Sequence, residues 1–421
     1  MRKYTTPLLL AASTLLGSII TPLASAQTVL VHGKTLVTNT NMGTIDAPTL
    51  LVKDGMIEII STNANIPTDT SISGDGYWIT PGIFAGYSRL GLVEVSAEKT
   101  TNDMSASDAD QSVSLRASDG FNPKSTSVPV SRLGGVIYAA VSPGAGSDIF
   151  GGIGMVTSTT GSFNSIVKDP AFYYVELGEN GADTSGGSRL AAIGHFRAAL
   201  SDAKSSGGFK SPDDGDALAR IDAKALKMAL SGQYPLIIAT DRAAEMKRLI
   251  EIKSEHPKLN INILGGAEAW MVKNDLANAD IGVLIDPIEN LPYSFGALGT
   301  RTDNAKQLID AGVTTGFMSR SATGAFSQNL RLLGQHAGNA VANGVKWEDA
   351  FKAVTITPAK MYGLEKFAVI RTGSKANFVV WDGDPLEVTS APVAIFIDGQ
   401  LQSMQSRQTK LRDRYHPKRD L

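Results

Sequence analysis

Histidine is the side chain that most often binds a catalytic metal ion near neutral pH, so its spacing is the first indicator of chemistry in this chain. No two of the five histidines stand at metal-ligand spacing: His32, His195, His256, His336 and His416. A zinc site needs three or four ligands around one small cavity. We therefore expect no metal and no other cofactor, and we interpret His195 and His336, which fall in helical patterns, as structural or surface groups.

Other catalytic patterns are also missing. The chain has no cysteine, which excludes thiol catalysis, disulfides and thiolate metal sites. No Gly-x-Ser-x-Gly turn stands between a strand and a helix. The glycine runs at 144–146 and 151–154 lack the Gly-Lys-Ser/Thr ending of a phosphate loop and the spacing of a dinucleotide fingerprint. We interpret both runs as tight turns.

The elements that would position functional residues change character along the chain. Residues 28–78 contain short β-branched or apolar runs separated by turn residues, which predicts a small β unit. From 79 to 365, strands alternate with helices: strands at 136–141, 173–177, 235–239, 261–264, 282–285 and 314–318, and helices at 222–230, 243–253, 303–311 and 327–343. This alternation favours an α/β fold with a (β/α)₈ TIM barrel, and a doubly wound open sheet is the alternative.

Strand patterns return after the barrel, at 375–381 and 393–399. We expect them to rejoin the N-terminal strands, so that residues 28–78 and 366–402 form one β-sandwich domain built from both chain ends. The polar stretch at 96–128 predicts a long excursion at the barrel mouth. The basic tail at 403–421 is interpreted as a solvated helix or frayed end rather than a binding patch.

Short motifs along nearly the whole of the chain beyond residue 26 occur together in an informative order. They are Thr-Pro-Gly at 80–82, Gly-Gly-Val at 134–136, Gly-Gly-Ala-Glu-Ala-Trp at 265–270, Asn-Leu-Pro at 290–292, Arg-Thr-Asp-Asn-Ala at 301–305, Thr-Pro-Ala-Lys at 357–360 and Ala-Asn-Phe-Val-Val-Trp at 376–381. In order and spacing the chain resembles the amidohydrolase superfamily, in particular its exported imidazolonepropionase-like branch. The resemblance implies a (β/α)₈ barrel with a β-sandwich, hydrolysis of C–N bonds, and zinc or a similar divalent metal.

The positions that hold the metal in that family carry different residues here. Tyr87 and Arg89 stand at the two histidines of the first strand, and Ala239 and Asp241 at those of the fifth. The sixth-strand histidine corresponds to Gly265, the eighth-strand aspartate falls at 319–320, and no lysine lies within 173–177. Arginine is permanently protonated and has no lone pair for a cation. The resemblance therefore implies a degenerate metal site.

The same resemblance places six polar side chains at the barrel mouth as candidate ligand-binding residues: Tyr87, Arg89, Asp241, Arg242, Glu268 and Arg320. Arg89 and Arg320 would replace the positive charge of the metal and pair with Asp241. Two interpretations follow. The residues form an inert ion-pair plug, or they bind an anion, because paired arginines suit planar carboxylates.

Two functions follow from these observations. The first is an exported, non-catalytic relative that binds a small carboxylate or amide, or a protein partner such as a second copy or an active paralogue. The alternative is a hydrolase of C–N bonds in small amides or peptides, with a displaced or metal-free site. The segment at 1–26 contains Arg2 and Lys3 and no acid, so 39 basic residues become 37 against 41 acidic ones beyond it, a net charge of −4. Nucleic acid is therefore not an expected partner.

The N-terminal segment predicts export. Arg2 and Lys3 precede an apolar stretch at 8–20, and Ala24-Ser25-Ala26 forms a small-residue cleavage site. The stretch is short and is interrupted by Ser13, Gly17 and Ser18, so a membrane anchor is disfavoured. Mass spectrometry of the periplasmic or secreted protein should find Gln27, or its cyclised form, at the N-terminus. An intact Met1 in a membrane fraction would contradict this prediction.

Overall fold

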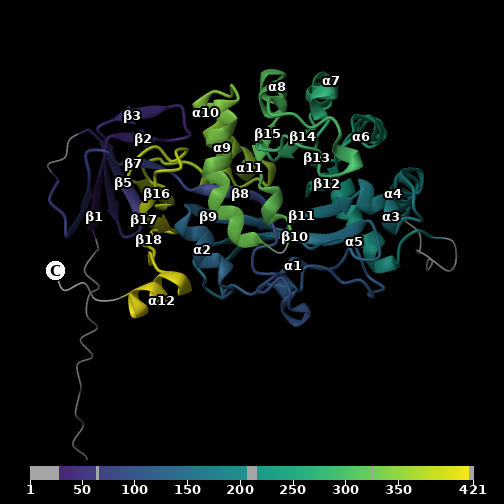
Figure 1. Ribbon diagram of the computed structural model, residues 1–421, viewed down its shortest axis with the longest axis horizontal. Coiled ribbons are helices and arrows are strands. Elements are labelled where there is room, and N and C mark those ends of the chain that lie inside the picture. The colour runs from purple at the N-terminus through teal and green to yellow at the C-terminus, as the bar shows by residue number, and fades with distance from the viewer. Residues whose placement is uncertain (1–27, 63–65, 206–215, 325, 417–421) are drawn as a thin grey trace, which may run out of the picture.

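The computed structural model describes residues 28–62, 66–205, 216–324 and 326–416, and the predicted signal segment at 1–26 lies outside them. Figure 1 shows a β-sandwich at one end of the molecule and a larger barrel beside it. No helix in the described ranges is long and apolar enough to cross a membrane.

The sandwich is built from both ends of the chain, as the sequence predicts. One sheet has the order β5-β4-β1-β6: β1 Thr28–His32, β4 Thr49–Lys53, β5 Met56–Ser61 and β6 Thr70–Ser73. The other has the order β18-β17-β16-β7-β2-β3: β2 Thr35–Val37, β3 Thr44–Asp46, β7 Trp78–Pro81, β16 Phe378–Trp381, β17 Pro392–Ile397 and β18 Gln400–Leu401. Val31 and Leu50 from the first sheet share a buried core with Phe378 from the second. Burial of these apolar side chains holds the two chain ends together.

An eight-stranded sheet in chain order forms the barrel wall. Its strands are β8 Ile83–Ser88, β9 Val136–Val141, β10 Phe150–Ser158, β11 Ile166–Glu176, β12 Leu236–Thr240, β13 Ile261–Gly265, β14 Gly282–Ile285 and β15 Thr315–Phe317. The first and last strands lie in contact, so the barrel is nearly closed. A single large core fills and surrounds it. The predicted TIM-barrel fold with its β-sandwich is confirmed.

One strand departs from the parallel pattern. β10 runs antiparallel to both β9 and β11, and the remaining neighbours are parallel. Its connections, residues 142–149 and 159–165, are too short for the helical crossover that a parallel strand needs. The glycine run at 151–154, interpreted above as a tight turn, therefore lies inside a strand. Gly154 pairs with Phe172 of β11, and the ring of Phe172 fills the space of the missing side chain.

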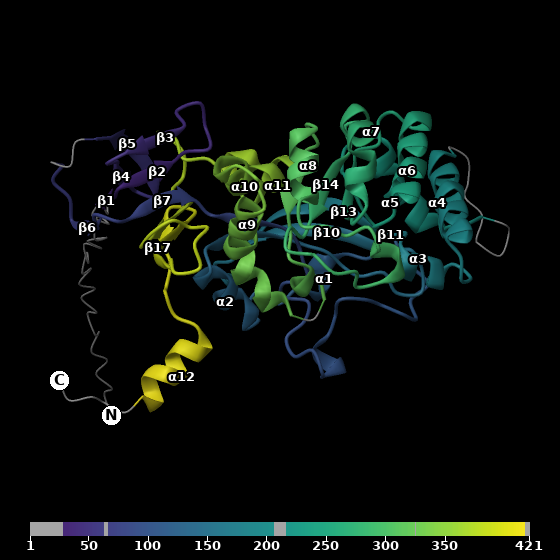
Figure 2. The ribbon, with the colours of Figure 1, turned by 45° about the horizontal axis from the view of Figure 1, so that its top comes forward.

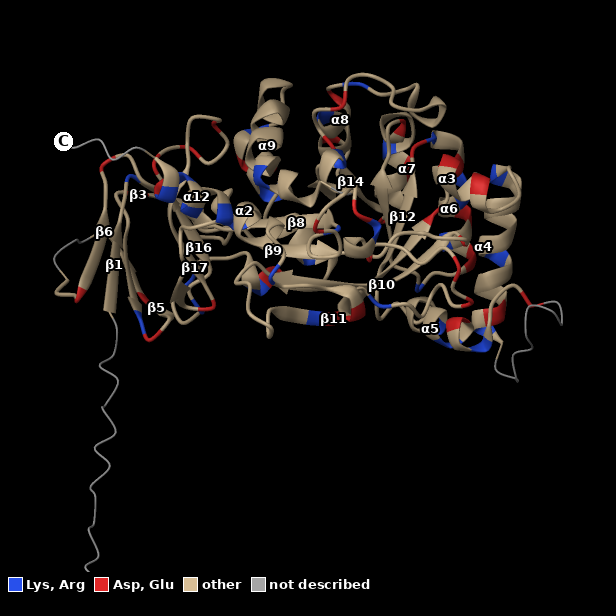
Figure 3. Ribbon diagram, turned by 60° about the horizontal axis from the view of Figure 1, so that its bottom comes forward, with Lys and Arg blue, Asp and Glu red and all other residues tan. Residues whose placement is uncertain are grey.

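Helices cover the barrel between most of the remaining strands (Figure 2). They are α1 Ala117–Gly120, α2 Ser127–Leu133, α3 Glu179–Thr184, α4 Arg189–Lys204, α5 Arg220–Leu230, α6 Ala243–Glu255, α7 Lys273–Asn278, α8 Asn304–Asp310, α9 Leu333–Ala342, α10 Trp347–Ala353, α11 Ile356–Met361 and α12 Arg407–Tyr415. Short 3-10 turns are η1 Lys99–Thr101, η3 Ala269–Val272, η4 Phe295–Ala297, η5 Arg320–Ala322, η6 Ser327–Leu332 and η7 Glu365–Phe367. Figure 3 shows that basic and acidic residues are interspersed over the outer helices.

The polar excursion at 96–128 is anchored to the barrel by a buried carboxylate. Asp222, in the first turn of α5, accepts backbone hydrogen bonds from Ser112 at 3.0 Å and Ser114 at 2.8 Å. The hydroxyl of Ser112 also donates to Asp148, whose other oxygen lies 2.9 Å from Nε2 of His195. These contacts hold the excursion close to the mouth of the barrel.

The close approach of β10 and β11 can be tested at Gly154. In Gly154→Ala the new Cβ would lie 2.1 Å from the ring of Phe172, so this buried ring or the strands must shift. We expect a loss of about 1–3 kcal/mol in the free energy of unfolding, measured in urea. Gly194→Ala in α4 is the matched control, because nothing lies within 4 Å of its Cβ position. It should stabilise the protein by about 0.5–1 kcal/mol. Equal stability of the two variants would show that this strand register is wrong.

Candidate ligand-binding site

A cavity of about 420 Å³ opens where the barrel strands end. Four of the six predicted site residues line it: Tyr87, Arg89, Asp241 and Arg320. The first two come from the end of β8, Asp241 follows β12, and Arg320 follows β15. The topology therefore brings together side chains that are more than 200 positions apart in sequence.

Arg89 is buried against two tyrosine rings. Its side chain is 6% exposed, and its guanidinium carbon lies 5.2 Å from the ring centre of Tyr87 and 5.1 Å from that of Tyr174. Nη1 donates to the carbonyl of Ser142 at 2.5 Å and Nε to that of Thr323 at 3.2 Å. No carboxylate of the described residues forms an ion pair with it. The rings and carbonyls partly replace water around the cation.

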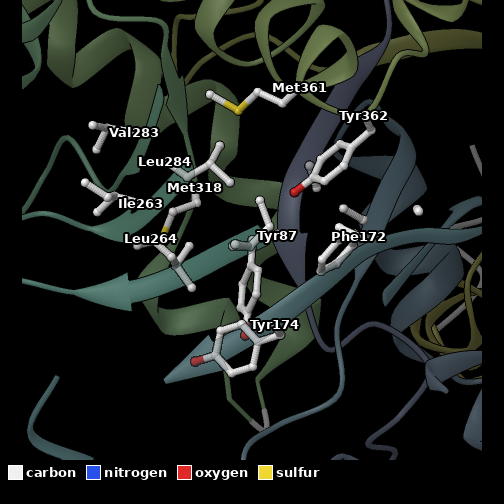
Figure 4. Packing of buried hydrophobic residues seen from close by; sticks show 14 of the residues in the cluster. Tyr87, Phe172, Tyr174, Ile263, Leu264, Val283, Leu284, Met318, Met361 and Tyr362 are labelled. Carbon is white, nitrogen blue, oxygen red and sulfur yellow. The ribbon is translucent and has the colours of Figure 1, made fainter. Parts of the chain in front are cut away.

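Tyr87 supplies shape rather than a reactive hydroxyl. Its ring packs against that of Tyr174, with 5.5 Å between the ring centres, and Figure 4 shows both at the edge of the barrel core. Burial raises the pKa of its hydroxyl above the ordinary value. That hydroxyl makes no hydrogen bond of good geometry within the described residues, although Ser142 and Tyr174 are polar neighbours. A neutral, buried phenol cannot serve as a metal ligand in the way that an imidazole does.

Arg320 has the opposite environment, because it is paired with acids. Its guanidinium donates to both oxygens of Glu289 and lies 3.6 Å from Asp241 Oδ1. Its backbone N–H donates to Asp286 at 2.8 Å. The guanidinium also covers the ring of Tyr293, at 3.7 Å from the ring centre. Burial lowers the pKa of Arg320, but these acids outweigh that effect and raise it. The predicted pairing of Arg320 with Asp241 is present, with Glu289 as the closer partner. The predicted pairing of Arg89 with Asp241 is wrong, because Asp241 pairs with Arg320 alone among the described arginines.

Both carboxylate oxygens of Asp241 have partners within the protein. Tyr293 donates to its Oδ2, and the backbone N–H of Ala267 donates to Oδ1 at 3.2 Å. The same Oδ1 lies 2.7 Å from the position that a Cβ on Gly265 would take. Gly265 has φ +100, which residues with side chains rarely adopt. A histidine at Gly265 would therefore require Asp241 and the local backbone to move.

The remaining two predicted residues lie off the cavity. Glu268 accepts the backbone N–H of Ala243 at 3.0 Å and thereby caps the first turn of α6. Arg242 donates to the carbonyl of Phe295 at 3.4 Å. Both match motif positions, but neither lines the cavity, and their hydrogen bonds connect loops at the ends of the barrel strands.

Several residues of the cavity wall were not found from the sequence. They are Tyr174, Glu176, Glu179, Asn180, Arg189, Glu245 and Tyr293. Glu176 is the last residue of β11, inside the strand predicted at 173–177, so strand-end position was a usable signal for it. Tyr293 and the nearby Glu289 follow β14 in an irregular loop, where periodicity gives no information.

Glu176 and Arg89 also line a second cavity, of about 220 Å³, beside the first. The two cavities share Asn180 and Thr323 as well. The far wall of the smaller cavity includes Met104 and Ser105 of the polar excursion. The excursion predicted at the barrel mouth therefore contributes to this second space.

The divalent metal that the resemblance implies does not fit these side chains. Within the described ranges, no group of three or more His, Cys, Asp or Glu side chains could hold a metal ion. His336, the nearest barrel histidine in sequence to Arg320, is buried on α9 with its Nδ1 3.1 Å from Asp286. Arg89 and Arg320 would repel a dication from the cavity that they line.

The buried acid Glu289 predicts how stability depends on pH. Burial, opposed by Arg320, raises its pKa from 4.5 to about 7. The folded protein therefore holds this proton more tightly than the unfolded chain, and stability should fall as pH rises from about 4.5 to about 7.

Glu289→Gln should make this fall in the free energy of unfolding less steep across that window, measured by urea titrations at several pH values. Glu348→Gln, an exposed acid on α10, is the control and should follow the wild-type slope. Equal slopes for Glu289→Gln and wild type would show that folding does not raise the pKa of Glu289.

Comparisons with known proteins bear on the family and the fold. A family model described as the amidohydrolase family matches residues 256–406. The chain is 24% identical over 402 residues to amidohydrolase tasK of Hapsidospora irregularis. The match covers 84% of this chain and 39% of that protein. The chain thus spans well under half the length of that relative.

Solved structures show the same fold. An amidohydrolase from Thermotoga maritima has a TM-score of 0.77 and 24% identity, covering 89% of this chain and 99% of that one. A prolidase complexed with N-methylphosphonate-L-proline has a TM-score of 0.58 and 13% identity, covering 90% and 100%. Together, the family match over 256–406 and the shared barrel support the amidohydrolase superfamily, whose fold this chain has.

Proposed function

We propose that this chain is an exported, imidazolonepropionase-like relative of the amidohydrolases that binds a small carboxylate in the barrel cavity and does not catalyse metal-dependent hydrolysis. The proposal rests on one observation: the buried guanidinium of Arg89 has no carboxylate partner among the described residues. Of the described arginines that line the cavity, Arg189 and Arg320 have carboxylate partners, and Arg89 has none.

The donors of Arg89 support a carboxylate ligand. A guanidinium has five N–H donors. Backbone carbonyls accept from Nε and from Nη1, and no acceptor among the described residues takes a hydrogen bond from Nη2. A planar carboxylate can accept two parallel hydrogen bonds from such a fork. Because the cation is already removed from bulk water, a bound anion also relieves part of the cost of burying it.

The absence of metal ligands supports a binding function over catalysis. A zinc-bound hydroxide needs neutral or anionic ligands that lower the pKa of water towards 7. Tyr87, Arg89 and Gly265 supply none, and the oxygens of Asp241 already have partners.

The alternative is a metal-free hydrolase acting on small amides or peptides. One observation favours it: burial raises the pKa of Glu176, which could then act as a general acid. A general base opposite it would also be needed. Asp241 is the acid for that role, but Tyr293, Arg320 and a backbone N–H occupy it.

Export is proposed from the N-terminal segment alone, through Arg2, Lys3 and the small residues before Gln27. The cysteine-free composition suits an oxidising compartment, because no thiol can mispair there. Identification of Gln27 as the mature N-terminus is the measurement that tests this part of the proposal.

Calorimetric titration with 4-methylpentanoate tests the carboxylate site. Purified, chelator-treated wild type should bind it, and Arg89→Gln should weaken binding by about tenfold or more, because a charged hydrogen-bond donor is lost. Arg89→Lys keeps the charge but loses the fork, so it should recover only part of the affinity. Arg248→Gln, on the exposed face of α6, is the control.

Two outcomes would contradict the proposal. One is equal binding, or no binding, of 4-methylpentanoate by wild type and Arg89→Gln. The other is stoichiometric zinc in protein purified without added metal, together with amide hydrolysis that a chelator abolishes. That second result would favour the hydrolase alternative.

A further inference from the structure

Five of the seven charged side chains that line the large cavity form ion pairs within the protein. Arg189 forms ion pairs with Glu179 and Glu245, and Arg320 does so with Asp241 and with Glu289 behind the wall. Two charged side chains of the lining have no such partner among the described residues: Arg89 and Glu176. They have opposite signs, so the cavity offers one unpaired cation and one unpaired acid.

Glu176 has one oxygen to offer. Its Oε2 accepts the hydroxyl of Tyr174 at 2.5 Å, and no described residue donates a hydrogen bond to Oε1. Its backbone N–H donates to the carbonyl of Ile149 at 2.7 Å, which fixes the end of β11. Burial raises the pKa of the carboxyl group, so a bound cation would stabilise its ionised form.

Tyr174 positions both unpaired groups. Its ring centre lies 5.1 Å from the guanidinium carbon of Arg89, and its hydroxyl bonds to Glu176. Arg89 and Glu176 nevertheless form neither a hydrogen bond nor an ion pair with each other. Tyr174 therefore contacts both charged groups, which are not paired with each other. Both groups line the cavity, where a small ligand can reach them.

Both groups line the large cavity and the small one. Asn180 and Thr323 do the same, and they add neutral hydrogen-bonding groups around this shared wall. Leu264 and Met318 contribute apolar surface to the large cavity alone. A ligand that contacts both charges would therefore have room for an apolar group on the Leu264 side.

We infer that the ligand is a zwitterion with the head group of a free α-amino acid. Its carboxylate binds Arg89, its ammonium group binds Oε1 of Glu176, and an apolar side chain lies against Leu264 and Met318. This inference rests on the proposed carboxylate site and adds the second charge. A simple carboxylate would leave Glu176 unpaired, and a simple amine would leave Arg89 unpaired, so each should bind less tightly.

A matched trio of ligands separates the two charges. L-Leucine carries both groups, 4-methylpentanoate lacks the ammonium group, and 3-methylbutylammonium lacks the carboxylate. In calorimetric titrations of the full-length purified protein at neutral pH, L-leucine should bind about tenfold or more tightly than either analogue. In Glu176→Gln, L-leucine should bind no more tightly than 4-methylpentanoate. The amide oxygen can still accept a hydrogen bond from Tyr174, but the amide carries no charge to attract the ammonium group.

The outcomes distinguish this inference from the function on which it rests. If wild type binds 4-methylpentanoate as tightly as L-leucine, and Arg89→Gln weakens both, the zwitterion inference is overturned and the carboxylate site stands. If Arg89→Gln leaves both affinities unchanged, or if wild type binds none of the three, both are overturned. Glu255→Gln is the control, because that acid lies at the end of α6 away from both cavities, is paired with Arg197, and should keep the preference for L-leucine. Equal melting temperatures would show that the variants are folded.

Discussion

The guanidinium of Arg320 organises the mouth of the barrel. It joins the end of β15 to Glu289 after β14 and to Asp241 after β12, and it covers the ring of Tyr293. A divalent metal would connect strand ends in a comparable way, by attracting anionic and neutral ligands from several strands. An arginine connects them through a planar set of N–H donors, and it is part of the chain, so a chelator cannot remove it. The arrangement needs acids around a cation, and the loops after β12 and β14 supply them.

This constraint explains why the cavity is polar but not uniformly charged. Arg320 is paired with Asp241 after β12 and with Glu289 after β14, and Arg189 is paired with Glu179 after β11 and with Glu245 on α6. Arg89, after β8, has different surroundings, because aromatic rings and backbone carbonyls contact its guanidinium. Most charged groups of the cavity wall therefore belong to ion pairs, whereas Arg89 has only rings and carbonyls as partners among the described residues.

The sequence predicted the fold well because the fold depends on long-range alternation. The strands at 136–141 and 282–285 have the predicted bounds. The strand β10 was not predicted from the sequence, because its glycines are typical of turns. No residue pattern shows that the ring of Phe172 fills the space beside Gly154.

The site was predicted in part, for a physical reason. Motifs mark the residues that begin or end strands, such as Arg89 and Asp241, because their backbone position is fixed by the sheet. Partners such as Glu289 and Tyr293 come from an irregular loop, and their approach depends on packing that no local pattern encodes. Glu268 matches a motif position but does not line the cavity, because its carboxylate accepts a hydrogen bond from the first residue of α6.

The antiparallel β10 has a consequence for how the chain reaches its native state. β9, β10 and β11 form a meander closed by two short loops, whereas most other neighbouring barrel strands pair only after a helix-containing segment has been placed. Contacts between residues close in sequence have a small entropic cost of loop closure and form quickly. The meander can therefore assemble from local contacts alone. Its last strand carries Tyr174 and Glu176, so part of the cavity wall belongs to the segment of the barrel with the lowest contact order.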